Sequence, residues 1–227
     1  MESQQFKYKN LRCKMKKILM GLLMLLGGQG ICQEGIRVAC IGNSITEGPG
    51  RNHPQSYPLQ LQSILGEEFT VKNFGVSGST LLKNGDKPYW EEDQFEAAKV
   101  FKAEVLIIKL GTNDTKPQNW KYKDDFINDY VELVEMLKPT MGDTPRIFIC
   151  LPVPIFQDNW GITTSILNHE IIPALSEIAE KTGAEIIDLY SALEDKASLF
   201  PDGIHPNAQG NKVMAETVAS HVQMVKP

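Results

Sequence analysis

The stretch Ile36-Arg-Val-Ala-Cys-Ile-Gly-Asn-Ser44 runs from an apolar, β-branched segment into a glycine-bounded turn that carries a serine. Within it, Arg37–Ile41 has the length and apolar character of a strand that is buried on both faces. Four further runs of this kind follow along the chain: Phe69–Asn73, Val105–Leu110, Arg146–Leu151 and Glu185–Leu189. Strands of this kind are typical of a parallel sheet that is covered by helices.

Segments with helical spacing alternate with these strands. Four of them are predicted as helices: Tyr57–Leu65, Phe126–Lys138, Leu167–Lys181 and a last one from Asn207 to about Val225. Pro173 should kink the third helix or mark its true start, and Gly183 should end it. Five strands alternating with helices predict a three-layer α/β/α fold with a five-stranded parallel sheet, in one domain that spans residues 33–227.

The first 32 residues differ in composition from the rest of the chain. They carry six basic residues against one acidic residue, and the apolar run Ile18–Leu26 follows the last lysine. This order is typical of a secretory signal peptide, and the run is shorter than the ~20 residues that a membrane span needs. We therefore expect residues 1–32 to be a cleaved leader, with Met15 as an alternative start, and the protein to be exported. A lipid anchor on Cys32 is the competing interpretation.

The charge balance excludes one class of partner. The 227 residues include 23 Lys+Arg and 28 Asp+Glu, and the 195 residues after the leader keep 17 basic and 27 acidic ones, a net charge of −10. An acidic domain is a poor fit to nucleic acid, because phosphate binding needs a basic face. We also expect no membrane span after the leader.

Two cysteines remain after the leader, and both fall in predicted strands. Cys40 and Cys150 lie in apolar runs, so we expect buried core thiols rather than a disulfide. No cysteines or histidines show the spacing of a metal site, so we expect no metal.

Polar groups follow the predicted strands at the edge where ligands bind in parallel sheets. Ser44 follows the first strand, Gly78 the second and Asn113 the third, while His205 lies in a late turn three residues after Asp202. Acyl transfer needs a nucleophile, a base, a carboxylate that orients the base, and donors for the oxyanion. Ser44, His205 and Asp202 fit the first three roles. The Asn113 amide and the Gly78 backbone N–H fit the last.

In this order, the residues resemble the SGNH/GDSL hydrolase family over nearly the whole predicted domain. The four matching blocks are Gly42-Asn-Ser-Ile-Thr46, Asn73-Phe-Gly-Val-Ser-Gly78, Gly111-Thr-Asn-Asp114 and Asp202-Gly-Ile-His205. The resemblance implies a flavodoxin-like sheet and no metal or organic cofactor. One departure is Asn43, which stands where the family's name motif has Asp. Asparagine is nearly isosteric with aspartate and can still cap the turn.

The resemblance also implies a role for each residue. Ser44 would be the nucleophile and His205 the general base, with Asp202 orienting the imidazole. The oxyanion hole would consist of the backbone N–H groups of Ser44 and Gly78 together with the side chain of Asn113.

Aromatic residues follow the second, third and fourth strands, on the same predicted edge. Trp90, Trp120 and Trp160 could form a rim for stacking against sugar rings, although tryptophans also anchor long loops by burial. His53, in the loop after Ser44, is a further candidate for substrate contact.

Together, these features predict an exported serine esterase that works through an acyl-enzyme. A saccharide ester is the expected substrate, with short acyl groups, acetyl above all, as the groups removed. A lysophospholipase or thioesterase of the same family is one alternative. A non-catalytic carbohydrate-binding protein on the same fold is another, since fold alone does not determine function.

Overall fold

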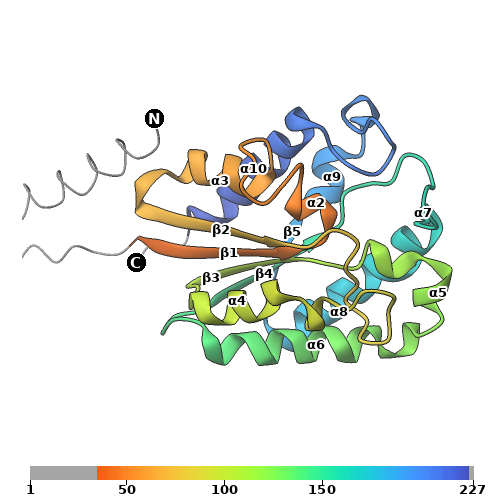
Figure 1. The fold of residues 1–227 in the computed structure, drawn as a ribbon, viewed down its shortest axis with the longest axis horizontal. Coiled ribbons are helices and arrows are strands. Elements are labelled where there is room, and N and C mark those ends of the chain that lie inside the picture. Colours follow the sequence, from red (N-terminus) through yellow and green to blue (C-terminus); the bar gives the residue numbers. More distant parts are fainter. Residues whose placement is uncertain (1–34, 225–227) are drawn as a thin grey trace, which may run out of the picture. The chain divides into compact units, whose positions relative to one another are not determined.

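The computed structural model describes residues 35–224, so the predicted leader and Cys32 lie outside the described residues. Five strands form one sheet in the order β2-β1-β3-β4-β5, and all neighbouring strands are parallel (Figure 1). Their bounds are β1 Ile36–Gly42, β2 Phe69–Gly75, β3 Val105–Lys109, β4 Arg146–Leu151 and β5 Glu185–Asp188. The predicted five-stranded parallel sheet is confirmed.

Helices cover both faces of this sheet (Figure 1). One face carries α3 (Tyr57–Leu65), α9 (Leu189–Leu193) and α10 (Ala208–Val222), and the other carries α4 (Asp93–Phe101), α6 (Phe126–Leu137) and α8 (Ile172–Thr182). Three short helices lie near the carboxyl ends of the strands: α2 (Ser44–Glu47), α5 (Pro117–Trp120) and α7 (Thr164–Ile166). The three-layer α/β/α prediction is confirmed. Among residues 35–224, no helix has both the length and the apolar character needed to cross a membrane.

Both cysteines of the described chain lie in the core. Cys40 in β1 and Cys150 in β4 are buried and unpaired, as predicted. Burial raises the pKa of the Cys40 thiol well above its usual value and that of Cys150 to about 12. Both thiols therefore stay protonated at neutral pH and act as small apolar core groups.

The chain before β5 departs from the predicted single α-helix. A π-helical turn, Leu167–Ile171, precedes α8, and Pro173 lies in the first turn of α8. Proline has no N–H to donate within a helix, but the first turn of a helix does not need one. The π turn thus lets Pro173 start an α-helix instead of kinking one, and Gly183, at a φ of +71°, ends it.

Among the helices of eight or more residues between residues 35 and 224, α4 is the one that was not predicted. The nine residues of α4 bury only Phe95 and Ala98, so the apolar period that would have revealed this helix is weak.

Two glycines allow α2 to lie directly against the ends of β1 and β2. A Cβ on Gly75 would lie 2.2 Å from Glu47 N, and a Cβ on Gly42 would lie 2.1 Å from Thr46 Oγ1, both in α2. Glu47 N is a backbone atom, so it cannot move aside without displacing α2, and the Thr46 side chain is buried. Because α2 begins with Ser44, the position of this serine depends on the absence of two side chains.

We therefore expect the substitution Gly75→Ala to destabilise the protein. The added methyl group would force α2 away from β2 and lower the free energy of unfolding by about 1–3 kcal/mol, the usual cost of overpacking. Urea denaturation followed by circular dichroism measures this change. Gly142→Ala is the control, since a Cβ there would meet only the Glu104 side chain, at 3.2 Å. Equal stability of Gly75→Ala and wild type would contradict the packing argument.

Candidate active site

Ser44 is the first residue of α2 and follows the N-cap residue Asn43. The Ile45 N–H donates to Asn43 Oδ1 at 3.1 Å, so the asparagine caps the turn as expected. The buried Asn43 Nδ2 has no hydrogen-bond partner within the described part of the chain. As the first helical residue, Ser44 has a backbone N–H with no carbonyl one turn earlier, which leaves it available to a ligand.

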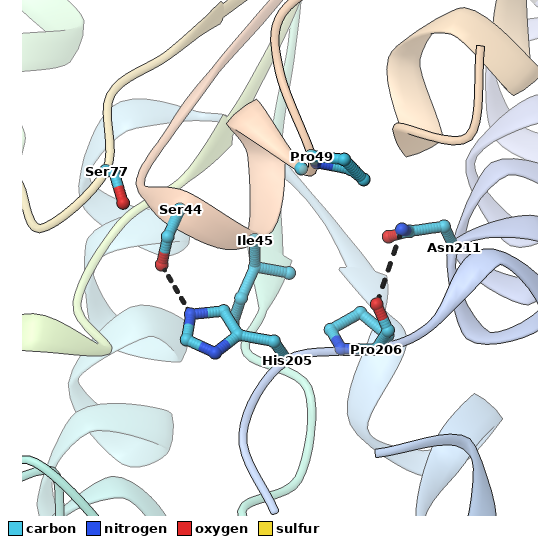
Figure 2. A pocket seen from close by; sticks show the side chains of 8 residues that line it. Ser44, Ile45, Pro49, Ser77, His205, Pro206 and Asn211 are labelled. Carbon is cyan, nitrogen blue, oxygen red and sulfur yellow. Dashed lines mark hydrogen bonds between the residues drawn. The ribbon is translucent and has the colours of Figure 1, made fainter. Parts of the chain in front are cut away.

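The Ser44 hydroxyl lies against an imidazole that is 161 residues away in sequence. Ser44 Oγ is 2.8 Å from His205 Nε2, and a dashed line marks this hydrogen bond in Figure 2. His205 Nδ1 is 2.8 Å from Asp202 Oδ2. In a neutral imidazole, Nδ1–H donates to the carboxylate, and Nε2 accepts from the serine hydroxyl. The structure thus brings the three predicted residues together in one hydrogen-bonded chain.

The Asp202 carboxylate is held by the backbone of its own turn. Its Oδ1 accepts the N–H of Ile204 at 2.8 Å and the N–H of His205 at 2.7 Å. Partial burial raises the pKa of Asp202, but these two bonds and the His205 ring outweigh it and hold the pKa below its usual value. The stability that this ionised carboxylate contributes is present above its unfolded-state pKa and is lost as the pH falls through the lowered value.

The predicted oxyanion donors lie at the same edge of the sheet. Gly78 has a φ of +82°, in the left-handed region that favours glycine. Asn113 is buried, and its Nδ2 donates to Ser79 O at 3.1 Å, which leaves its second hydrogen for a ligand. Ser77, the neighbour of Gly78, lines the same pocket as Ser44. Both predicted donors therefore lie on loops that follow the two strands flanking β1, the strand that leads to Ser44.

A buried carboxylate holds the loop that follows Gly78. Asp114 Oδ1 accepts the Leu82 N–H at 2.8 Å, and its Oδ2 accepts the Leu81 N–H at 3.1 Å. Burial raises the pKa of Asp114 to about 6, although the two backbone N–H groups favour its charged form. These bonds tie the loops after β2 and β3 to each other.

Glu47 holds the same loop through Ser77, a contact that the sequence did not predict. Its Oε2 accepts the Ser77 N–H at 2.7 Å, while its Oε1 pairs with Arg51 at 2.9 Å. Arg51 also donates to Gly75 O at 3.0 Å. In the sequence, the four-residue spacing between Glu47 and Arg51 was the feature that could have indicated this ion pair.

A pocket of about 280 Å³ opens beside the serine–histidine pair (Figure 2). It is lined by Ser44, Ile45, Gly48, Pro49, Ser77, His205, Pro206 and Asn211. Its walls combine apolar and polar side chains and include no carboxylate, amine or guanidinium, which suits an uncharged group. Within residues 35–224, no group of three or more His, Cys, Asp or Glu side chains could hold a metal ion.

Trp160 is the tryptophan that the structure brings to this site. Its side chain is 58% exposed, and its ring centroid lies 5.6 Å from that of His205. Trp120, by contrast, is only 8% exposed and packs edge-on against Phe126, with ring centroids 5.4 Å apart. These contacts favour the alternative interpretation for Trp120, that the indole anchors its loop by burial in the core.

Trp90 and His53 make contacts away from the serine. Trp90 Nε1 donates to Leu81 O at 2.7 Å, and its ring packs against Phe95 with centroids 5.6 Å apart. These contacts favour the alternative interpretation that Trp90 anchors a long loop. His53 is exposed, and its Nδ1 accepts the Gln55 N–H at 3.2 Å. A substrate contact by His53 stays a prediction.

Comparisons with known proteins show the family to which the chain belongs. A family profile described as the GDSL-like Lipase/Acylhydrolase family matches residues 40–213, and the chain belongs to this family. Over 210 residues, the chain is 42% identical to an acetylxylan esterase from Xylanibacter ruminicola. The match covers 84% of this chain but only 44% of that protein, so the chain spans less than half of its relative's length.

Solved structures share the fold. A carbohydrate acetylesterase from Sinorhizobium meliloti superposes with a TM-score of 0.68 at 20% identity, covering 85% of this chain and 100% of that one. An acetylxylan esterase from Geobacillus stearothermophilus superposes with a TM-score of 0.62 at 22% identity, covering 84% and 96% of the two chains.

The hydrogen-bonded chain predicts that Asp202→Asn makes Ser44 much less reactive. The amide cannot hold the imidazole in the tautomer that accepts the serine proton, so labelling of Ser44 by a serine-directed phosphonate should slow by roughly 10³-fold or more. Stopped-flow or mass-spectrometric labelling rates measure this effect. Asp188→Asn is the matched control, because Asp188 also ends a strand but caps α9 through the Ser191 N–H. Equal slowing in the two variants would contradict the role assigned to Asp202.

Proposed function

We propose that this protein hydrolyses carboxylic esters through an acyl-enzyme on Ser44, and that its substrates are acetylated carbohydrates. The observation that carries the proposal is the chain of 2.8 Å contacts from Ser44 through His205 to Asp202. Family membership supports the same reaction class, and so do the predicted donors Gly78 and Asn113 on the loops after the strands that flank β1.

In the first half of the reaction, Ser44 Oγ attacks the acyl carbon and its proton passes to His205 Nε2. The carbonyl oxygen becomes an oxyanion that accepts hydrogen bonds from the N–H groups of Ser44 and Gly78 and from Asn113 Nδ2. Asp202 stabilises the imidazolium that forms. The bond from the acyl carbon to the alcohol oxygen then breaks, and His205 returns its proton to that oxygen.

In the second half, water replaces the alcohol. His205 takes a proton from the water as the water oxygen attacks the acyl carbon of the Ser44 ester. The tetrahedral intermediate collapses, the bond to Ser44 Oγ breaks, and the serine recovers its proton from His205. The products are the free carboxylic acid and the unmodified enzyme, so the cycle needs no cofactor.

Acetyl removal from a carbohydrate is supported by the relatives. The protein at 42% identity is an acetylxylan esterase, and a structural neighbour is a carbohydrate acetylesterase. The pocket beside Ser44 has no carboxylate, amine or guanidinium among its lining residues, so it is compatible with a small, uncharged acyl group.

We expect acetate release from acetylated xylo-oligosaccharides to exceed hydrolysis of the matched butyryl and octanoyl esters, with a kcat/KM at least about tenfold higher. Acid release in a pH-stat measures all three. Ser44→Ala should reduce each rate by roughly 10⁴-fold or more, because the nucleophile is lost. A preference for octanoyl esters or for a lysophospholipid would favour the lipase alternative. Full activity in Ser44→Ala would overturn the acyl-enzyme, and saccharide binding without Ser44 labelling would favour a non-catalytic binder.

We further propose that the protein is exported. The basic start and the apolar run Ile18–Leu26 support a leader that ends before Gln33. Expression of the full chain in a bacterial host should yield a periplasmic or extracellular protein whose mass matches a chain that begins at Gln33. The variant Leu23→Arg, which breaks the apolar run, should stay in the cytoplasm at full length. A lipid-modified Cys32 in the membrane fraction would establish the anchor instead. An uncut wild-type chain in the cytoplasm would contradict export.

A further inference from the structure

The loop between β4 and α7 ends in a tight turn, Asn159-Trp160-Gly161-Ile162. Ile162 N–H donates to Asn159 O at 2.8 Å, and φ is +50° at Trp160 and +79° at Gly161. Positive φ at both central residues is the signature of a type I′ turn, whose first central position favours asparagine, aspartate or glycine. Trp160 is one of two non-glycine residues with positive φ between residues 35 and 224, and a bulky side chain there holds a strained backbone.

Hydrogen bonds on both flanks tie this strained turn to the active-site loops. Before it, the Phe156 N–H donates to Gly203 O at 2.8 Å, inside the turn that carries Asp202 and His205. After it, the Thr163 N–H donates to Thr115 Oγ1 at 3.1 Å, two residues beyond Asn113. These bonds offset the strain and hold the turn against the catalytic loops. Backbone strain of this kind concentrates at functional sites.

The turn presents an aromatic face that packing does not account for. At 58% exposure, Trp160 is the most exposed aromatic residue among the large exposed hydrophobics of the described chain. Its ring is tilted by 51° to the His205 imidazole, with centroids 5.6 Å apart. An indole this exposed, on a strained and tethered turn, is typical of a binding residue rather than of a core residue.

We infer that Trp160 is the platform on which the sugar ring carrying the scissile acetyl group stacks. The inference rests on the proposed function, because in that reaction His205 must donate a proton to the departing sugar oxygen. That oxygen therefore lies within hydrogen-bond distance of His205 Nε2, and the ring bearing it lies beside the imidazole. Trp160 flanks the same imidazole, so its indole can cover the apolar face of a pyranose in that position.

This placement separates two functions within one site. The groups around Ser44 act on the acyl carbon, which every acetyl ester presents. Trp160 acts on the alcohol side, which differs between a saccharide and a small alcohol. The indole therefore determines which acetyl esters are hydrolysed efficiently, and it leaves the chemistry at the acyl carbon unchanged.

The test compares Trp160→Asn and Trp160→Phe on two substrates. Asparagine suits the first central position of a type I′ turn, so Trp160→Asn removes the ring and keeps the turn. We expect kcat/KM for acetylated xylobiose to fall about tenfold through KM, while kcat/KM for ethyl acetate stays within about twofold of wild type. Trp160→Phe, which keeps an aromatic face, should recover most of the saccharide activity. Thermal unfolding checks that both variants keep the wild-type fold.

Other outcomes separate the inference from the proposed function. Equal losses on both substrates would overturn the inference and make Trp160 a positioning residue for His205. Unchanged kcat/KM for acetylated xylobiose in Trp160→Asn would overturn it directly. A wild-type protein that hydrolyses neither ester would refute the proposed function. In that case, tryptophan fluorescence of Ser44→Ala decides the inference independently: acetylated xylobiose should shift the emission to the blue, and the shift should vanish in Ser44→Ala combined with Trp160→Asn.

Discussion

The close approach of α2 to the ends of β1 and β2 is the constraint on which the site depends. Gly75 lets the backbone of α2 contact the backbone of β2, and Gly42 leaves room at the end of β1 for the Thr46 side chain of the same helix. Ser44 is the first residue of α2, so this contact fixes its position. Side-chain rotations elsewhere in the core do not move a nucleophile that backbone contacts hold in place. Acyl transfer requires such a fixed geometry.

Carboxylates that accept backbone N–H groups hold the loops around this serine. In the loop after β2, Asp114 accepts the N–H groups of Leu81 and Leu82, and Glu47 accepts the N–H of Ser77. Asp202 accepts backbone N–H groups of its own turn. Charge-assisted bonds of this type are short and directional, and they define a loop conformation more narrowly than apolar contacts do. Burial of the Asp114 carboxylate is costly, and its raised pKa reflects that cost. The result is a rigid frame for Gly78 and Asn113.

The sheet and the hydrogen-bonded chain could be predicted because both follow from local patterns. Apolar runs identify the strands of a parallel sheet, and every such strand delivers its following loop to the same edge. Ser44 and Asn113 were therefore expected at one edge once the strands were recognised. The Asp202–His205 turn is separated from β5 by α9, and it was assigned to this edge from its Asp-x-x-His spacing and the family resemblance. The helix α4 and the π turn before Pro173 could not be recognised in this way, since their apolar periods are weak or shifted.

The tryptophans mark the boundary between what the sequence determines and what the tertiary structure decides. The sequence by itself placed an aromatic residue after each of three strands. It also placed candidate catalytic residues after the first three strands and in a late turn. It could not separate Trp120 from Trp160, because both follow a strand in a polar, turn-rich segment. The fold buries Trp120 against Phe126 and presents Trp160 beside His205. Burial and exposure of a side chain depend on contacts between segments far apart in sequence, and only the packed structure brings these segments together.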